Sequence, residues 1–184
     1  TRSRDDQKRA DDLVKRNFNA DHPDQLWVSD FTYIQTHSGW VYTAFIIDVF
    51  SRAIVGWKVS TRMNTDMVLD ALEQALHDRG MPKNVIHHSD RGVQYLSIRY
   101  TNRLEAANLR ASVGTTGDSY DNALAETVNG LYKTEVIEYL KADWQGLADV
   151  QLATLNWVDW FNKERVHSAL DYVSPFDFEA MYYD

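Results

Sequence analysis

Three carboxylates stand at positions from which they can act together. Asp30 lies inside an expected strand, Asp90 directly follows another, and Glu126 lies in the first turns of an expected long helix. Each alone has an ordinary explanation: a buried aspartate satisfied by hydrogen bonds or an arginine, a turn residue before Arg-Gly, and a solvated helix face. Taken jointly, the three can converge at one edge of a sheet.

Converging carboxylates repel one another unless a cation lies between them. Hard oxygen ligands select Mg²⁺ or Mn²⁺ over softer metals. Two such ions about 4 Å apart can activate an attacking oxygen and stabilise a leaving oxygen in phosphoryl transfer. The three acids therefore predict a metal site for phosphoryl transfer that needs no covalent protein intermediate.

The composition is that of a globular domain with a sizeable core. The chain has 184 residues, of which 44% are hydrophobic and 12% aromatic. No apolar run approaches the roughly 20 residues of a membrane span. The absence of cysteine excludes disulfides, thiolate zinc sites and a cysteine nucleophile, and it fits a reducing cytoplasm.

The charge distribution contains features both for and against binding to nucleic acids. The net charge of −8 argues against a module that simply coats DNA or RNA. Residues 79–110, however, carry six bases against two acids, whereas residues 143–184 carry eight acids against two bases. A basic central stretch is compatible with a surface that partly faces DNA.

The hydrophobic pattern predicts a mixed α/β fold. Strands are expected over 26–35, 40–50 and 53–60, and their short connections favour an antiparallel meander. A helix, strand, helix, strand, helix and helix are expected to follow, within 64–82, then over 84–88, 97–108, 109–113, from about 122, and 144–163. Asn64 or Thr65 can cap the first of these helices, Gly80 with Pro82 marks its end, and Ser97 opens the second. The remainder is interpreted as a tail. Ligands of such sheets gather at the carboxyl ends of strands, where Asp90 stands.

Several ordered blocks of the sequence resemble the catalytic domain of insertion-sequence transposases with an integrase-type core. The 35 residues between Asp90 and Glu126 match the D,D(35)E signature shared by these transposases and retroviral integrases. The similarity extends from about residue 25 to 175. Its blocks are WVSDFTYI, IIDVFSRAIVGW, HSDRGVQY, GDSYDNALAE and WFNKERVHSALDYVSP.

The resemblance implies a ribonuclease H-like fold, with three antiparallel strands plus parallel strands in one sheet flanked by helices. Residues 24–140 would form the catalytic core, 141–184 its C-terminal helical extension, and 1–23 a charged lead-in or linker. Asp30, Asp90 and Glu126 would be catalytic and would bind Mg²⁺ or Mn²⁺, as two ions.

The same resemblance implies hydrolysis of a phosphodiester at the element's end, followed by attack of the freed 3′-hydroxyl on a second phosphodiester. The partners would be DNA, as element ends and target, and further copies of the chain in a homo-oligomer on that DNA. The expected setting is the bacterial cytoplasm, without a membrane. The helix-turn-helix region that such transposases use to find their ends is expected to be absent from this chain.

Seven further residues are expected to contact DNA or to support the metal ligands. Most of them have an equally good structural explanation: core packing for Tyr95, helix capping for Asn122, a solvated lysine for Lys133, and bracing for Arg165 and His167. The full set is Gln94, Tyr95, Asn122, Asn129, Lys133, Arg165 and His167.

Other conspicuous residues are given structural roles. His87 and His88 are expected to pack or to support the site, because no third ligand at a recognisable spacing favours a zinc site. Asp48 is expected to pair with Arg52 across a turn. The tryptophans of the C-terminal third are expected in the core or at an interface rather than against bases; they are Trp144, Trp157 and Trp160.

Two rival functions remain. A metal-dependent nuclease of the same fold would hydrolyse DNA without joining it, so only a branched product distinguishes the two enzymes. A non-catalytic DNA-binding protein descended from a transposase is the other, although a lost activity would no longer require Asp30, Asp90 and Glu126 all to be intact.

Overall fold

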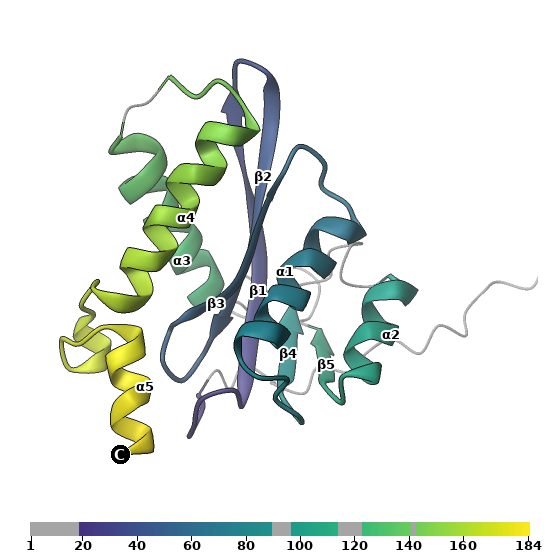
Figure 1. Cartoon of the computed structure of the whole chain (residues 1–184), viewed down its shortest axis with the longest axis vertical. Coiled ribbons are helices and arrows are strands. Elements are labelled where there is room, and N and C mark those ends of the chain that lie inside the picture. Colours follow the sequence, from purple (N-terminus) through teal and green to yellow (C-terminus); the bar gives the residue numbers. More distant parts are fainter. Residues whose placement is uncertain (1–18, 90–96, 114–122, 141–142) are drawn as a thin grey trace, which may run out of the picture.

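A mixed five-stranded sheet forms the centre of the molecule in the computed structural model, which describes residues 19–89, 97–113, 123–140 and 143–184 (Figure 1). The strands lie in the order β3-β2-β1-β4-β5. The first three pair antiparallel, whereas β4 and β5 run parallel to β1. The predicted sheet is thus confirmed, with β1 (Leu26–Thr36), β2 (Gly39–Asp48), β3 (Ile54–Ser60), β4 (Ile86–Ser89) and β5 (Arg110–Val113).

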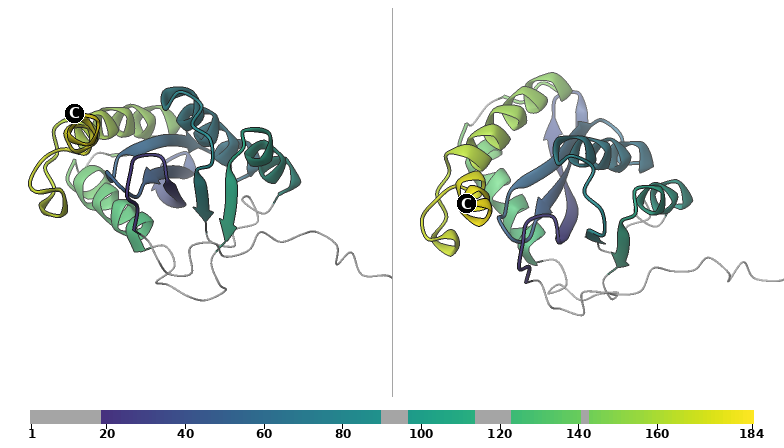
Figure 2. Two further views of the ribbon diagram at one scale, coloured as in Figure 1. Left: turned by 90° about the horizontal axis from the view of Figure 1, so that it is seen from below. Right: turned by 60° about the horizontal axis from the view of Figure 1, so that its bottom comes forward.

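Helices cover both faces of this sheet, as Figures 1 and 2 show. The helix start predicted at Ser97 is confirmed, and of the two caps predicted for the preceding helix, Asn64 or Thr65, the structure has Asn64. Each of these side chains accepts a backbone N–H of the first turn. A π-helical turn, η1, continues α3 directly. The helical elements are α1 (Thr65–Asp78), α2 (Ile98–Ala106), α3 (Ala123–Tyr132), η1 (Lys133–Glu138), α4 (Leu147–Lys163), η2 (Ser168–Leu170) and α5 (Pro175–Tyr183). No helix in the described ranges is long and apolar enough to cross a bilayer.

The sheet separates two hydrophobic cores. Side chains alternate along a strand, so Trp27 of β1 packs with α1 and α2, while its neighbour Val28 packs with α3 and α4. Both residues are fully buried. Burial on both faces fixes β1, the strand of Asp30, at the centre of the fold.

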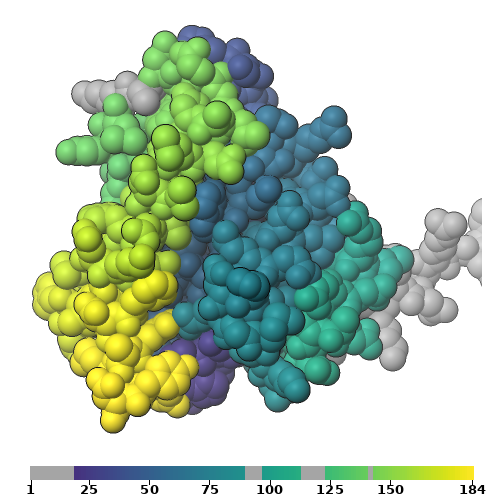
Figure 3. All heavy atoms as spheres, viewed as in Figure 1, coloured from purple at the N-terminus to yellow at the C-terminus, as the bar shows by residue number. Residues whose placement is uncertain are grey.

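The outer strand β3 is closed off by its neighbours. A Cβ at Gly56 would lie 2.3 Å from the carbonyl oxygen of Ala71, so only glycine lets α1 pack this closely. Asn162 of α4 accepts from the N–H of Ile54 at 2.8 Å and donates to its carbonyl at 2.9 Å. These contacts occupy backbone groups that an edge strand otherwise exposes. A furrow of about 360 Å³ remains between α1 and α4, on the face seen in Figure 3.

The chain beyond Lys163 is not a tail, and that part of the prediction is wrong. Ser174 caps α5, Pro175 opens it, and Phe178 packs on Phe50 with ring centroids 5.0 Å apart. The apolar residues of α5 do not gather on one face, so the helical period is invisible in the sequence. Tertiary contacts, not amphipathic pattern, hold this helix.

Candidate active site

Asp30 lies in the middle of β1, half-buried, and its carboxylate is held from two sides. Oδ1 accepts the backbone N–H of Phe31 at 2.8 Å. Oδ2 accepts the side-chain amide of Asn129, on α3, at 3.0 Å. The second bond joins the strand of the first acid directly to the helix that carries Glu126.

Glu126 lies one turn before Asn129 on α3. Residues three apart share a helix face, and their Cα atoms are separated by about 4.5 Å along the axis. Glu126 is exposed and forms no ion pair with any described residue. Asn129 itself is buried together with Val128 and Tyr132, so it does not share the exposure of Glu126.

Asp90 falls outside the described residues, as do Gln94, Tyr95 and Asn122. The neighbouring residue Ser89 is described, and it ends the parallel ladder between β1 and β4 level with Ser29. Asp30 is the residue that follows Ser29. Figure 2 shows α3 and the ends of β4 and β5 on the same, lower side of the molecule in its left view.

The two histidines of β4 pack inside the fold. His87 Nε2 lies 2.8 Å from Ser29 Oγ and 2.7 Å from the Tyr100 hydroxyl. Burial lowers the pKa of His87 to about 3, so the ring is neutral. His88 Nδ1 lies 2.8 Å from Ser112 Oγ. Within the described ranges no three His, Asp or Glu side chains gather as metal ligands.

Lys133 begins η1, one turn beyond Asn129. Its side chain is exposed, and its ammonium lies 5.4 Å from the centroid of the Tyr33 ring. The cation therefore stands over an aromatic ring of β1, the same strand that carries Asp30.

Arg165 braces η1 from the end of α4. Its Nε and Nη2 donate to Glu135 Oε1 at 2.9 and 2.7 Å, and Trp157 donates to Glu135 Oε2 at 2.9 Å. His167 is buried with its ring 4.8 Å from that of Phe161. Burial and the nearby Arg165 charge lower the His167 pKa to about 4. These contacts favour the bracing role expected as one alternative for Arg165 and His167.

The three tryptophans divide between core and surface. Trp144 and Trp157 are buried, and Trp157 stacks among Phe45, Tyr132 and Phe161. Trp160 is 41% exposed and lines a hollow of about 610 Å³ between η1 and α4.

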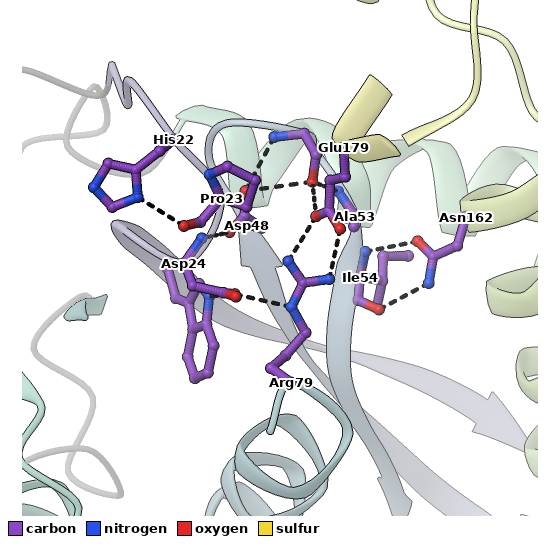
Figure 4. Close-up of polar contacts among 11 residues, drawn as sticks. His22, Pro23, Asp24, Asp48, Ala53, Ile54, Arg79, Asn162 and Glu179 are labelled. Atoms are coloured by element: carbon purple, nitrogen blue, oxygen red, sulfur yellow. Dashed lines mark hydrogen bonds and ion pairs between the residues drawn. The ribbon is translucent and has the colours of Figure 1, made fainter. Parts of the chain in front are cut away.

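A second group of acids, which the sequence analysis missed, surrounds Arg79 (Figure 4). The guanidinium donates to Glu179 through two nitrogens, at 2.8 and 2.7 Å, and to Asp24 at 2.8 Å. Asp48 accepts the backbone N–H groups of Asp24 and Ser51 at 2.7 and 3.0 Å. The expected pairing of Asp48 with Arg52 is wrong, because Arg52 gives it only a backbone contact, to the main-chain oxygen.

Burial dominates the electrostatics of Asp48. The side chain is fully buried, and this raises its pKa to about 6 even though two N–H groups favour the charged form. The only sequence signal for the group was an acid at the end of a strand. The other members of the group are Asp24, Arg79 and Glu179, which no local sequence pattern connects with Asp48.

The described bases of the stretch 79–110 do not form one open cationic face. Arg99 pairs with Asp66 at 2.8 Å, and Arg103 pairs with Glu73. Both acids belong to α1, which lies beside α2. With Arg79 also paired, three of the six bases in this stretch are neutralised within the chain.

Comparison with known proteins agrees with this geometry. Two models described as integrase core domain match residues 20–119 and 107–175. The transposase for insertion sequence element IS629 of Shigella sonnei is 56% identical over 174 residues, covering 95% of this chain and 58% of the relative. The putative transposase for IS986/IS6110 of Mycobacterium tuberculosis is 51% identical over 180 residues, covering 95% and 64%. The chain thus spans about three fifths of the length of these curated relatives.

Solved structures confirm the ribonuclease H-like fold. The HTLV-2 integrase catalytic core domain in complex with magnesium aligns with a TM-score of 0.69 at 18% identity, over 88% of this chain and 99% of that one. The simian T-cell lymphotropic virus intasome chain aligns with a TM-score of 0.74 at 17% identity, over 86% and 55%. The chain belongs to the integrase core domain family, and over about three fifths of their length it is similar to curated insertion-sequence transposases.

Proposed function

We propose that this chain cuts and joins DNA strands, with Asp30, Asp90 and Glu126 as its catalytic acids. The observation that carries the proposal is the hydrogen bond from Asn129 to Asp30, which fixes the helix of Glu126 against the strand of Asp30. Membership of the integrase core domain family supports the reaction class. The spacing of Asp90 and Glu126 in the sequence supports the assignment of the third acid.

The donor set fits Mg²⁺ or Mn²⁺. Carboxylate oxygens are the ligands these hard ions prefer, and Glu126 is exposed and available. The N–H groups of Phe31 and Asn129 each donate to one oxygen of Asp30 and so orient its carboxylate. Two bound ions would lower the pKa of an attacking water and stabilise the leaving oxygen.

The role of the protein itself would be to position its acids and the DNA for the reaction. Asn129 fixes the rotamer of Asp30, because its amide is itself buried in the α3 core. Ser89 lies level with Ser29 in the parallel ladder, so Asp90, the next residue in the sequence, would belong to the same site as Asp30. Lys133 would meet a phosphate, and Gln94, Tyr95 and Asn122 would line the same site.

The substrates would be the DNA ends of a mobile element and a target DNA. Two ends require two active sites, so the working form would be a homo-oligomer assembled on DNA, in the bacterial cytoplasm. The supporting observations are the names of the relatives, which are insertion-sequence transposases, and of a structural neighbour, which is an intasome.

The test joins a labelled oligonucleotide with a free 3′-hydroxyl to a supercoiled plasmid, using this chain and Mn²⁺. Wild type is expected to produce both nicked plasmid and plasmid that carries the label. Asp30→Asn, Asp90→Asn and Glu126→Gln should each lower both products at least about 1000-fold, since a metal site contributes several kcal/mol to the transition state.

Glu138→Gln is the matched control, because Glu138 is also exposed and ends η1 on the same continuous helix. It should retain wild-type activity. Nicking without label transfer would mean that the chain is a nuclease, which hydrolyses DNA without joining it. Metal-independent DNA binding with neither product, unchanged in the three variants, would indicate a non-catalytic protein.

A further inference from the structure

Two large aromatic rings lie open to solvent on the β1–β2 hairpin. Tyr33 is 56% exposed and Trp40 is 50% exposed. Their centroids are 5.2 Å apart and the rings are nearly perpendicular, at 86°. The ladder pairs Gln35 with Trp40 and Tyr33 with Tyr42, so the two rings are diagonal neighbours on one face.

Tyr33 and the neighbouring Lys133 extend the candidate active site along β1 and along the continuous helix of α3 and η1. Tyr33 follows Asp30 by three residues of β1, a distance of about 10 Å. Lys133 follows Asn129 by one helical turn, about 6 Å. The ammonium of Lys133, 5.4 Å from the Tyr33 ring centroid, ties the two elements together at this end.

The rings lie on the hairpin beyond the described pairing of β1 with β4. Strand alternation turns Tyr33 to the sheet face opposite Asp30, yet Lys133 reaches it from the helix on the face of Asp30. Both residues therefore meet at the margin of β1, beyond Ser29, where the described ladder to β4 has ended. A strand of DNA that crosses Asp30 and Glu126 along this margin passes the rings next.

We propose that Tyr33 and Trp40 form a stacking platform for unpaired DNA bases, one or two nucleotides from the phosphodiester that reacts. The inference rests on the proposed function and adds a contact to it. Aromatic rings stack on the face of any base, whereas in a duplex those faces are already covered by neighbouring bases. Lys133 supplies the charge complementary to the phosphates of the same strand, in a chain whose net charge is −8.

The experiment compares two labelled DNAs by fluorescence anisotropy with this chain in EDTA, so that no cleavage occurs. One is a blunt duplex, and the other is the same duplex with a four-nucleotide unpaired tail. Wild type should bind the tailed DNA about tenfold more tightly, and Trp40→Ala should abolish this preference while leaving the blunt duplex unaffected. Trp40→Phe should restore most of it.

Lys133→Gln should weaken binding of both DNAs and lower the salt dependence of the tailed complex by about one unit of slope. Tyr172→Ala is the matched control for a lost exposed ring, since Tyr172 is 72% exposed elsewhere on the surface. It should change neither affinity.

Three outcomes would overturn the platform. These are equal affinity of wild type for both DNAs, an unchanged tail preference in Trp40→Ala, and a change of oligomeric state in Trp40→Ala, which would make the rings a protein interface. Failure of the proposed reaction is recognised separately. In that case the joining assay fails while the tail preference and its loss in Trp40→Ala remain.

Discussion

Two regions of this molecule gather acids, and they treat them in opposite ways. Around Arg79, the carboxylates of Asp24, Asp48 and Glu179 meet a guanidinium and backbone N–H groups inside the protein (Figure 4). In the candidate active site, Asp30 is oriented by neutral donors and Glu126 is exposed. The first group contains its own cation, whereas Glu126 forms no ion pair with any described residue.

The two regions have different roles: the Arg79 group stabilises the fold, whereas the candidate active site serves the proposed reaction. The Arg79 group joins residue 24, the end of β2, the end of α1 and helix α5, which lie far apart in the chain. Such a group resists removal of any member, because the remaining charges stay buried without a partner. Glu126 can be changed at little cost to the fold, since water already solvates its side chain.

The largest stability effect is expected from Arg79→Met. This change keeps much of the side-chain volume but leaves the neighbouring carboxylates without their cation. Arg79 and Glu179 are only 12% and 11% exposed, so the free energy of unfolding should fall by about 3–5 kcal/mol. Urea denaturation at pH 7 measures it, with Glu126→Gln as the control that should remain within about 0.5 kcal/mol of wild type. A loss below about 1 kcal/mol would show that solvent, rather than Arg79, stabilises the charges of these carboxylates.

Asp48 should make the stability of the fold depend on pH. Its folded pKa, about 6, lies above its unfolded value of 3.8. The stability it contributes is therefore complete below pH 3.8 and is lost as the pH rises through 6. By linkage, the stability of wild type relative to Asp48→Asn should decrease by about 2 kcal/mol between pH 4 and pH 7.

Subtracting the variant removes the contribution of the buried histidines. His87 and His167 have folded pKa values lowered to about 3 and about 4, so their stabilising contribution is lost as the pH falls below 6.5. That trend runs opposite to the trend of Asp48 and is common to both proteins. Parallel curves of stability against pH for wild type and Asp48→Asn would contradict the raised pKa of the buried Asp48.

Local pattern was sufficient for the sheet and for the helices whose apolar residues share a face. The starts at Asn64 and Ser97 followed from capping chemistry alone. Helix α5 could not be predicted, because its order depends on Phe50 and Arg79 rather than on its own period. Spacing likewise drew attention to Asp30 and Glu126, but not to the Asn129 bond between their elements, which requires α3 to pack on β1.

The smallest effect, and the clearest test of what separates the two regions, is expected from Arg99→Ala. Arg99 and Asp66 lie 2.8 Å apart, the same separation as Arg79 and Asp24. The exposed fractions differ: 67% and 64% for the first pair, against 12% and 17% for the second. An exposed pair gains little, because water screens both charges and each side chain loses rotamer freedom.

Arg99→Ala should therefore change the free energy of unfolding by less than about 1 kcal/mol, and 0.5 M NaCl should erase most of that change. Urea denaturation of Arg99→Ala and Arg79→Met in the same buffers gives the comparison directly. Equal losses in the two variants would mean that contact distance sets the strength of an ion pair in this protein. A several-fold difference would assign that strength to burial, which is the property that distinguishes the acids around Arg79 from Glu126.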